Sequence, residues 1–258
     1  MLVEKIGQLL QACSTDAPYF PPTELYNDEW LLRLVLDWFA THDAPDHALC
    51  VAEGAHWFAE ARLPTNFTKR HTGDNLAERR TQVDGVIGHF KIAHKGEKAQ
   101  LTLKASAQQF VVLEAKLFSL LSGGIKVARY FDQAARTVAC MAEALSQADR
   151  YPVDMDRIGF YVIAPRLQIE RGTFADYLSR ESLRRKVKQR IKAYDDKKKR
   201  RWYSEWADPT IEQIRLDALS WETLIAYIGA QDAVAGPALA DFYERCIQYN
   251  VNVGERNY

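Results

Sequence analysis

The sequence predicts an α/β protein with a mixed central sheet flanked by helices, and three observations support this prediction. The runs 109–116 (QFVVLEAK) and 158–165 (IGFYVIAP) are apolar without alternation, which is typical of central strands covered on both faces. The stretch between them, from about 126 to 147, is rich in alanine and suits a helix packed closely on a sheet. A strand, a helix and a second strand in this order indicate a parallel pair within one sheet.

Helices are expected before the sheet. The spacing of apolar residues predicts helices over 2–13, 28–41 and 46–62, and the last must end before Pro64. The helix over 28–41 has the clearest pattern, because its apolar residues repeat on one face: Trp30, Leu31, Leu34, Val35, Trp38 and Phe39.

The periodicity changes at about residue 80. A strand is expected there that curves near Gly85 and Gly88, followed by a turn at 94–97 and a returning strand over 99–104. Beyond about residue 168 the pattern is helical, with further helices expected over 211–227 and 238–249. We therefore expect residues 1–167 to hold the N-terminal helices and the sheet, and residues 168–258 to form a helical appendage packed on that core.

Composition describes an ordinary soluble globular chain, with 47% hydrophobic and 26% charged residues among 258. The apolar runs are too short for a membrane span, and the N-terminus does not resemble a secretory signal. The four cysteines lie far apart, which argues against a zinc site or a disulfide framework and favours the cytoplasm. The formal net charge is zero, yet residues 184–201 hold 11 basic and 2 acidic residues.

Charged residues end two of the expected strands. Asp84 stands between Val83 and an apolar run, and Glu114-Ala115-Lys116 closes the strand over 109–116. An unpaired buried charge is costly, so inward-facing acids at these positions need a reason. A divalent cation supplies one: it would be held by Asp84, Glu114 and the carbonyl of Ala115, with Lys116 on the same strand face as Glu114.

This arrangement resembles the PD-(D/E)XK nuclease superfamily, the restriction-endonuclease-like fold, over roughly residues 50 to 167. The family pattern is an acid on one strand, (D/E)-x-K on the next core strand, and often a glutamine on the following helix. Asp84, Glu114-Ala115-Lys116 and Gln133 match it in this sequence, while Val83 replaces the proline that often precedes the first acid. The resemblance implies a core in the order α-β-β-β-α-β.

The resemblance also implies an activity, a metal-dependent hydrolysis of phosphodiester bonds in nucleic acid, with DNA as the expected substrate. Mg²⁺ is the expected metal, with Mn²⁺ as a substitute, and Asp84, Glu114 and Lys116 are the expected catalytic residues. Family members often add a carboxylate from the helix before the first strand, so Glu60 is a further catalytic and metal-ligand candidate. Glu53, His56 and Glu60 would then share one helix flank. Restriction, phage defence and repair are the settings that the family suggests.

Several basic residues are candidates for phosphate binding. Arg129, Gln133 and Arg136 would share one face of the helix after the Glu-x-Lys strand. The basic segment 184–201 admits three interpretations: a solvated helix face, a surface for the nucleic-acid backbone, or a site for an anionic protein. The nucleic-acid candidates within it are Lys197, Lys198, Lys199, Arg200 and Arg201, and the aromatic residues beyond them either stack on unpaired bases or anchor the helix: Trp202, Tyr203 and Trp206.

Two other functions remain open at this point. One is a catalytically silent nucleic-acid-binding or scaffold protein that keeps the fold, because a fold alone does not establish activity. The other is a nuclease subunit that needs a protein partner, and a homo-oligomer is a further option. The sequence contains no P-loop and no G-x-S-x-G motif, which argues against nucleotide-driven work and α/β-hydrolase chemistry.

Overall fold

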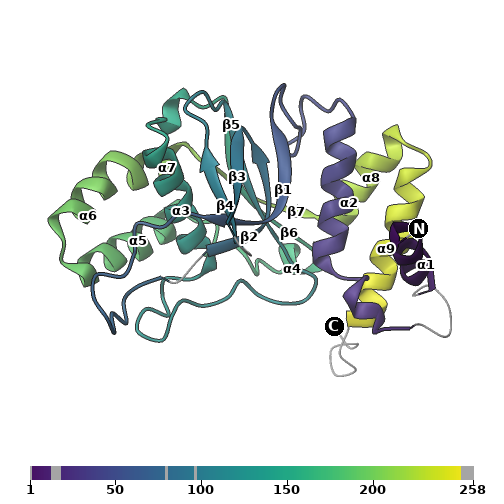
Figure 1. Ribbon diagram of the computed structural model, residues 1–258, viewed down its shortest axis with the longest axis horizontal. Coiled ribbons are helices and arrows are strands. Elements are labelled where there is room, and N and C mark those ends of the chain that lie inside the picture. Colours follow the sequence, from purple (N-terminus) through teal and green to yellow (C-terminus); the bar gives the residue numbers. More distant parts are fainter. Residues whose placement is uncertain (1, 13–18, 79–80, 96–97, 251–258) are drawn as a thin grey trace.

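Two helical layers enclose a central sheet in the computed structural model (Figure 1). The structure describes residues 2–12, 19–78, 81–95 and 98–250. In these residues seven strands form one sheet: β1 (His56–Leu63), β2 (Thr81–Gly88), β3 (Phe90–Lys95), β4 (Lys98–Leu103), β5 (Gln109–Ala115), β6 (Arg157–Ala164) and β7 (Arg215–Ser220). The α-helices of the same residues are α1 (Leu2–Ala12), α2 (Asp28–Thr41), α3 (Gln133–Gln147), α4 (Arg166–Glu170), α5 (Arg180–Tyr194), α6 (Lys197–Trp202), α7 (Asp208–Gln213), α8 (Trp221–Gln231) and α9 (Ala235–Asn250).

The sheet is mixed, with strand order β3-β4-β1-β2-β5-β6-β7. The pairs β1–β2 and β2–β5 are antiparallel, whereas β5–β6 and β6–β7 are parallel. Pairing of β2 with β1 extends over Thr81–Gly88, but its pairing with β5 covers only Gly85–Gly88. The two central strands therefore separate just before Gly85, and Asp84 stands at this fork.

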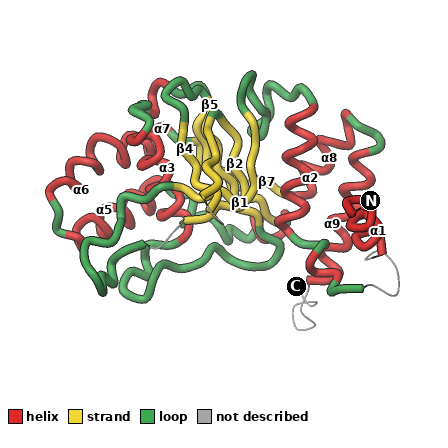
Figure 2. Tube along the Cα trace, viewed as in Figure 1, coloured by secondary structure: helices red, strands yellow, loops and turns green. Residues whose placement is uncertain are grey.

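Each face of the sheet has its own apolar core, and Figure 2 shows the strands between the two helical layers. Phe110, Val112 and Phe160 contribute to the core beneath α3, α5 and α7. Val111 and Leu113 contribute to the core shared with α2, α8 and α9. Every residue of β5 is buried, as expected for a central strand covered on both faces.

Several predicted elements are confirmed. The helix over 28–41 is α2, the strands over 109–116 and 158–165 are β5 and β6, and the helix over 238–249 lies within α9. Asn27 caps α2 by accepting a hydrogen bond from the Trp30 amide at 2.9 Å. The helix over 2–13 is α1 as far as Ala12, and residue 13 lies outside the described residues.

The helix predicted over 46–62 is wrong, because β1 occupies its second half. The apolar residues of β1 do not alternate: Trp57 packs with the α2 core, whereas Phe58 and Ala61 both pack with the α3 core. A left-handed backbone at Glu60, with φ of 59°, interrupts the alternation and leaves a pattern that resembles a helix. The helix predicted over 126–147 begins later, at Gln133, because Asp132 caps it by accepting a hydrogen bond from the Ala135 amide.

The helix predicted over 211–227 is also wrong. Helix α7 ends at Gln213, β7 pairs in parallel with β6, and α8 begins only at Trp221. The part of the chain beyond residue 168 is therefore not wholly helical, since it supplies the seventh strand of the sheet.

The segment predicted as one strand from about residue 80 forms two strands, β2 and β3, and the break between them follows Gly88. A Cβ atom at Gly88 would lie 2.3 Å from the Gln109 carbonyl oxygen, so this close approach requires glycine. The returning strand β4 pairs with β3 and lies beside β1, and residues 96 and 97 of the predicted turn lie outside the described residues. Among the described residues, every helix is too short or too polar to cross a bilayer.

Candidate active site

Asp84, Glu114 and Lys116 come together at the fork between β2 and β5. The Asp84 Oδ2 atom lies 3.1 Å from the Lys116 Nζ atom, and that Nζ atom lies 3.8 Å from Glu114 Oε2. The side chains of Glu114 and Lys116 are 0% and 11% exposed. Two acids distant in sequence thus meet beside one ammonium group in a nearly closed environment.

The strand geometry explains this convergence. Glu114 continues the face of β5 that carries Phe110 and Val112 toward α3, and Lys116 lies two residues farther along on the same face. Because β5 has no partner on the β2 side beyond Leu113, the Ala115 amide is free to donate to Asp84 Oδ2 at 2.8 Å. The Asp84 carboxylate therefore replaces a ladder hydrogen bond at the fork.

Helix α3 holds the Glu114 carboxyl group. Gln133 Nε2 donates to Glu114 Oε2 at 2.5 Å, and Thr137 Oγ1 donates to Glu114 Oε1 at 3.2 Å. Gln133 Oε1 also accepts a hydrogen bond from the Ser122 amide at 2.9 Å, which ties the loop before α3 to the site. Gln133 thus contacts the acid of the Glu-x-Lys strand, in the position that the sequence pattern predicts.

The surroundings shift the acid and the base in ways that favour a neutral carboxyl and a charged ammonium. Burial raises the pKa of Glu114 well above its ordinary value, the nearby Asp84 raises it further, and Lys116 lowers it in part. Burial alone would lower the pKa of Lys116, but Asp84 and Glu114 raise it above its ordinary value. Glu114 therefore retains its proton more readily than a solvated glutamate does.

Asp28, the first residue of α2, is a site residue that the sequence reasoning missed. Burial raises the pKa of Asp28, Lys116 lowers it and Asp84 raises it, and Asp28 in turn helps to raise the pKa of Lys116. Asp28 belongs to the helix that precedes β1, whereas Glu60, the carboxylate predicted on that helix, lies on β1 itself.

Glu60 lies on β1 and not on a helix, which corrects its predicted setting. It stands opposite Asp84, between the pairs Ala59–Gly85 and Ala61–Val83. Its carboxylate accepts a hydrogen bond from Gln82 Nε2 and lies 4.0 Å from Arg33 Nη2. Burial raises the pKa of Glu60, and the charge of Asp84 adds to that effect.

The other two members of the expected helix flank have separate surroundings. Glu53 lies in the turn before β1, where its carbonyl oxygen is 3.0 Å from His89 Nε2. His56 begins β1, and its ring centroid lies 4.2 Å from that of Phe90. Glu53 and His56 therefore do not share a helix face with Glu60.

The donor set at the fork suits Mg²⁺. No group of three or more His, Cys, Asp or Glu side chains that could hold a metal occurs among the described residues. Mg²⁺ is commonly bound through one or two carboxylates, with waters and substrate phosphates completing the octahedron. Asp84 and Glu114 meet that requirement, and the metal-binding roles predicted for Glu60 and for the Ala115 carbonyl remain predictions.

The two arginines predicted beside Gln133 differ in position. Arg129 is exposed in a turn before α3, so the predicted common helix face is wrong for it. Arg136 lies on α3, where its Nη2 atom is 3.4 Å from Ser122 Oγ. The buried Nε atom of Arg136 has no hydrogen-bond partner among the described residues, which leaves a donor directed inward near the site.

The basic segment 184–201 forms α5 and α6, and much of its charge is neutralised within the fold. Lys186 lies 2.8 Å from Asp132 and 2.7 Å from Asp176. Lys199 is buried and donates to the Asn66 carbonyl oxygen, while its role in nucleic-acid binding stays a prediction.

The predicted nucleic-acid residues that are exposed form two groups. Arg200 pairs with Asp195 at 2.8 Å and Arg201 pairs with Glu205 at 2.7 Å, while Lys197 and Lys198 lie exposed at the start of α6. The three aromatic residues that follow are buried, which favours the anchoring role over stacking on bases: Trp202, Tyr203 and Trp206.

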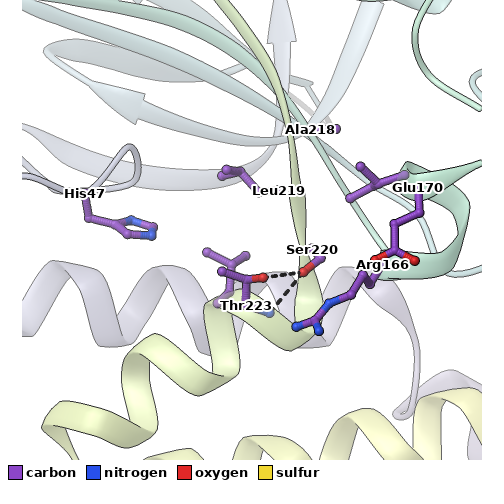
Figure 3. A pocket seen from close by; sticks show the side chains of 9 residues that line it. His47, Arg166, Glu170, Ala218, Leu219, Ser220 and Thr223 are labelled. Atoms are coloured by element: carbon purple, nitrogen blue, oxygen red, sulfur yellow. Dashed lines mark hydrogen bonds between the residues drawn. The ribbon is translucent and has the colours of Figure 1, made fainter. Parts of the chain in front are cut away.

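A cavity of about 410 Å³ lies beside β7, lined in part by Arg166, Ser220 and Thr223 (Figure 3). Ser220 caps α8, and its hydroxyl lies 2.7 Å from that of Thr223. The next residue, Trp221, is fully buried and donates from Nε1 to the Lys116 carbonyl oxygen at 2.9 Å. The N-terminus of α8 therefore fixes the backbone of the site lysine.

No protein-family model matches the chain, and neither curated proteins nor solved structures give a match.

Proposed function

We propose that this protein is a Mg²⁺-dependent nuclease of the PD-(D/E)XK type. The observation that carries the proposal is the convergence of Asp84, Glu114 and Lys116 at the fork of two central strands. A pair of carboxylates from neighbouring strands, held beside a lysine, is an arrangement suited to metal-assisted hydrolysis of a phosphodiester.

The order of the elements supports the same proposal. Helix α2, strands β1, β2 and β5, helix α3 and strand β6 follow one another along the chain, with the β3–β4 hairpin inserted before β5. The four strands are neighbours in the sheet, and α2 and α3 pack on opposite faces. This is the α-β-β-β-α-β order expected of a restriction-endonuclease-like core.

Each residue at the fork has a distinct role in this proposal. Bound Mg²⁺ would lower the pKa of a coordinated water and polarise the phosphate. Asp84 and Glu114 supply the carboxylate oxygens, and Gln133 and Thr137 hold the Glu114 carboxyl group in place. The Lys116 ammonium group orients the attacking water and offsets negative charge on the reacting phosphate.

The proposal is tested by incubating the purified protein with single-stranded DNA, duplex DNA and RNA in the presence of Mg²⁺ or Mn²⁺. We expect cleavage by the native chain and at least a hundredfold loss in Asp84→Asn, because the metal loses a charged ligand. Asp156→Asn is the matched control, since this exposed aspartate precedes β6 and lies at the other end of the β5–β6 pair from Glu114. Absence of cleavage with every substrate and both metals would refute the proposal.

A catalytically silent nucleic-acid-binding or scaffold protein is the second candidate. It is favoured by one observation: Asp84 and Lys116 already neutralise each other at 3.1 Å. This candidate predicts salt-sensitive binding of nucleic acid without cleavage under any metal. A nuclease subunit that needs a partner would instead cleave only after copurification with that partner.

A further inference from the structure

A cavity lies against the loop that joins β1 to β2. It has a volume of about 800 Å³, and its wall is formed by Thr65, Thr68, Lys69, Gly73, Asp74, Asn75, Ala77 and Glu78. Its volume falls in the range of small-molecule sites, roughly 300–1,000 Å³. The segment 64–78 that surrounds it is called the β1–β2 loop below.

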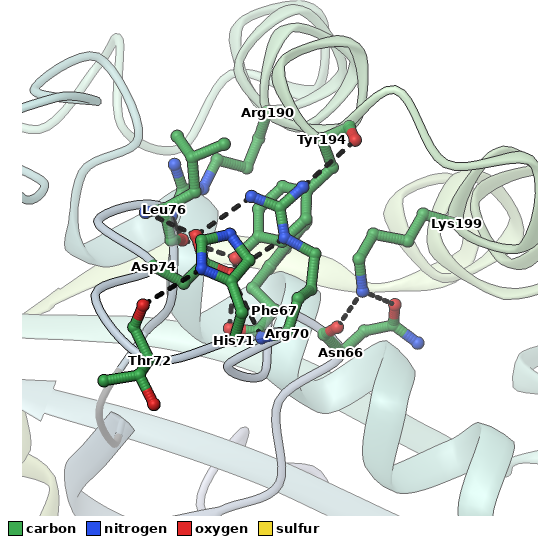
Figure 4. A network of polar contacts seen from close by, with 10 residues as sticks. All are labelled: Asn66, Phe67, Arg70, His71, Thr72, Asp74, Leu76, Arg190, Tyr194 and Lys199. Atoms are coloured by element: carbon green, nitrogen blue, oxygen red, sulfur yellow. Dashed lines mark hydrogen bonds and ion pairs between the residues drawn. The ribbon is translucent and has the colours of Figure 1, made fainter.

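The β1–β2 loop is held in one shape by its own polar contacts (Figure 4). The Asp74 carboxylate accepts hydrogen bonds from the Arg70 guanidinium at 2.8 and 2.9 Å and from the Leu76 amide at 3.1 Å. Arg70 also lies over the Tyr194 ring, with its Cζ atom 4.4 Å from the ring centroid. The cavity is therefore formed before any ligand arrives, which lowers the entropic cost of binding.

Residues of helices α5 and α6 contact the same loop. Arg190 is fully buried, lies 2.9 Å from Glu78 Oε1 and donates to the Leu76 carbonyl oxygen. Lys199 donates to the Asn66 carbonyl oxygen. Basic residues of the segment 184–201 thus serve to position this loop.

The side chains that remain available in the cavity suit a nucleotide. The acids Asp74 and Glu78 are neutralised by Arg70 and Arg190. Thr68, Lys69 and Asn75 are exposed and offer a hydroxyl, an ammonium and an amide group. The ammonium can contact a phosphate, and the hydroxyl and amide can bond to the edge of a base.

The loop that forms the cavity is connected directly to the strands at the fork. The β1–β2 loop joins the strands that carry Glu60 and Asp84, and the first residue of β2, Thr81, contacts Cys140 Sγ at 3.2 Å. Asp84 follows Thr81 on β2 by three residues, which corresponds to about 10 Å along the strand.

We propose that the cavity of the β1–β2 loop binds an unpaired nucleotide of the substrate strand. This inference rests on the proposed nuclease function and adds that the substrate carries a single-stranded segment. A concave wall of hydroxyl and amide groups can reach the Watson–Crick edge of an unpaired base, whereas pairing occupies that edge in a duplex.

The test measures binding in EDTA, by fluorescence anisotropy, so that the result depends on neither metal nor cleavage. The Kd of labelled single-stranded DNA, single-stranded RNA and a blunt DNA duplex is measured for the native chain and for three variants: Thr68→Ala, Asn75→Ala and Lys69→Ala. We expect Thr68→Ala and Asn75→Ala each to raise the Kd for single strands about threefold to tenfold, through loss of one hydrogen bond. We expect Lys69→Ala to reduce the slope of log Kd against log salt by about 0.7.

Lys91→Ala is the matched control, because Lys91 is an exposed lysine on β3 outside the cavity and outside the basic segment 184–201. The inference is overturned if the cavity variants leave the Kd for both single strands unchanged. It is also overturned if they weaken binding of the blunt duplex to the same degree. Asp84→Asn separates the two proposals, since it should remove cleavage, while Thr68→Ala and Asn75→Ala should still raise the Kd in EDTA when they are added to it. Cavity-dependent binding by a native chain that never cleaves would overturn the nuclease proposal alone.

Discussion

The Glu114 carboxyl group affects the stability of the fold as well as the candidate site. Its side chain is 0% exposed and its pKa is raised above the ordinary value, chiefly by burial. The folded state therefore prefers the protonated form, and ionisation is easier in the unfolded chain. Stability is fully present below the ordinary pKa of glutamate, about 4.3, and falls as the pH rises from there toward the folded pKa.

Glu114→Gln should remove this pH dependence, because an amide has no proton to lose. In EDTA we expect the free energy of unfolding of the variant to exceed that of the native chain by a margin that grows from pH 5 to pH 8. The measurement is urea unfolding at both values, with the exposed Glu53→Gln as control. Equal margins at the two pH values would show that Glu114 is not perturbed in this way.

At the element scale, α5 is a support for the β1–β2 loop, and Arg190 is its principal contact. The side chains of Arg190 and Glu78 are 0% and 3% exposed, and the Nε and Nη1 atoms of Arg190 lack hydrogen-bond partners among the described residues. Burying this pair has already cost desolvation energy. Removing one partner leaves the other charge buried and uncompensated.

Arg190→Met should therefore destabilise the fold by about 3–5 kcal/mol in urea unfolding at pH 7. Adding Glu78→Met should restore much of that loss, because the double variant buries two apolar side chains instead of one lone carboxylate. Arg185→Met serves as control, since that arginine is 59% exposed and belongs to a surface ion pair. A double variant as unstable as the single one would contradict this account.

The sequence predicted those elements whose local pattern agrees with their tertiary setting. Val111, Val112 and Leu113 are apolar because both faces of β5 are covered, so the strand and its charged end could be recognised directly. The segment 215–220 (RLDALS) has no such signal, and it is a strand only because β6 provides a partner. The pairing with β6 determines that this segment is a strand, and its local sequence does not indicate that pairing.

The candidate site shows the same division. Asp84, Glu114, Lys116 and Gln133 match the pattern of the family that the sequence resembles, and the structure brings these side chains together. Asp28 could not be identified, because its approach to Lys116 depends on how α2 packs against the sheet. The burial of basic residues in the segment 184–201 was hidden for a similar reason, since their acidic and carbonyl partners lie far away in sequence.

At the scale of the whole molecule, the part of the chain beyond residue 167 completes both layers. It supplies β7 at the edge of the sheet, and Leu183 and Val187 of α5 join the core beneath α3. Leu224 and Ile228 of α8 join the opposite core. The N-terminal portion alone would expose apolar surface on both faces.

A chain that ends at residue 167 should therefore lose cooperative unfolding and its near-ultraviolet circular dichroism. A chain that ends at residue 250 keeps all of the described C-terminal elements and should melt like the native protein, which makes it the control. Thermal melting followed by circular dichroism distinguishes the two. A cooperative transition in the shorter chain would show that residues 1–167 fold independently.

The left-handed backbone of Glu60 has a consequence for the direction of the chain. Gly85 faces Leu32 and Leu36 of α2, so its partner Ala59 faces α2 as well, whereas Ala61 packs toward α3. The torsion at one residue, which costs about 1–2 kcal/mol for a side chain other than glycine, rotates the end of β1 about its own axis. That rotation directs the chain that follows β1 toward the helical layer that contains α5 and α6.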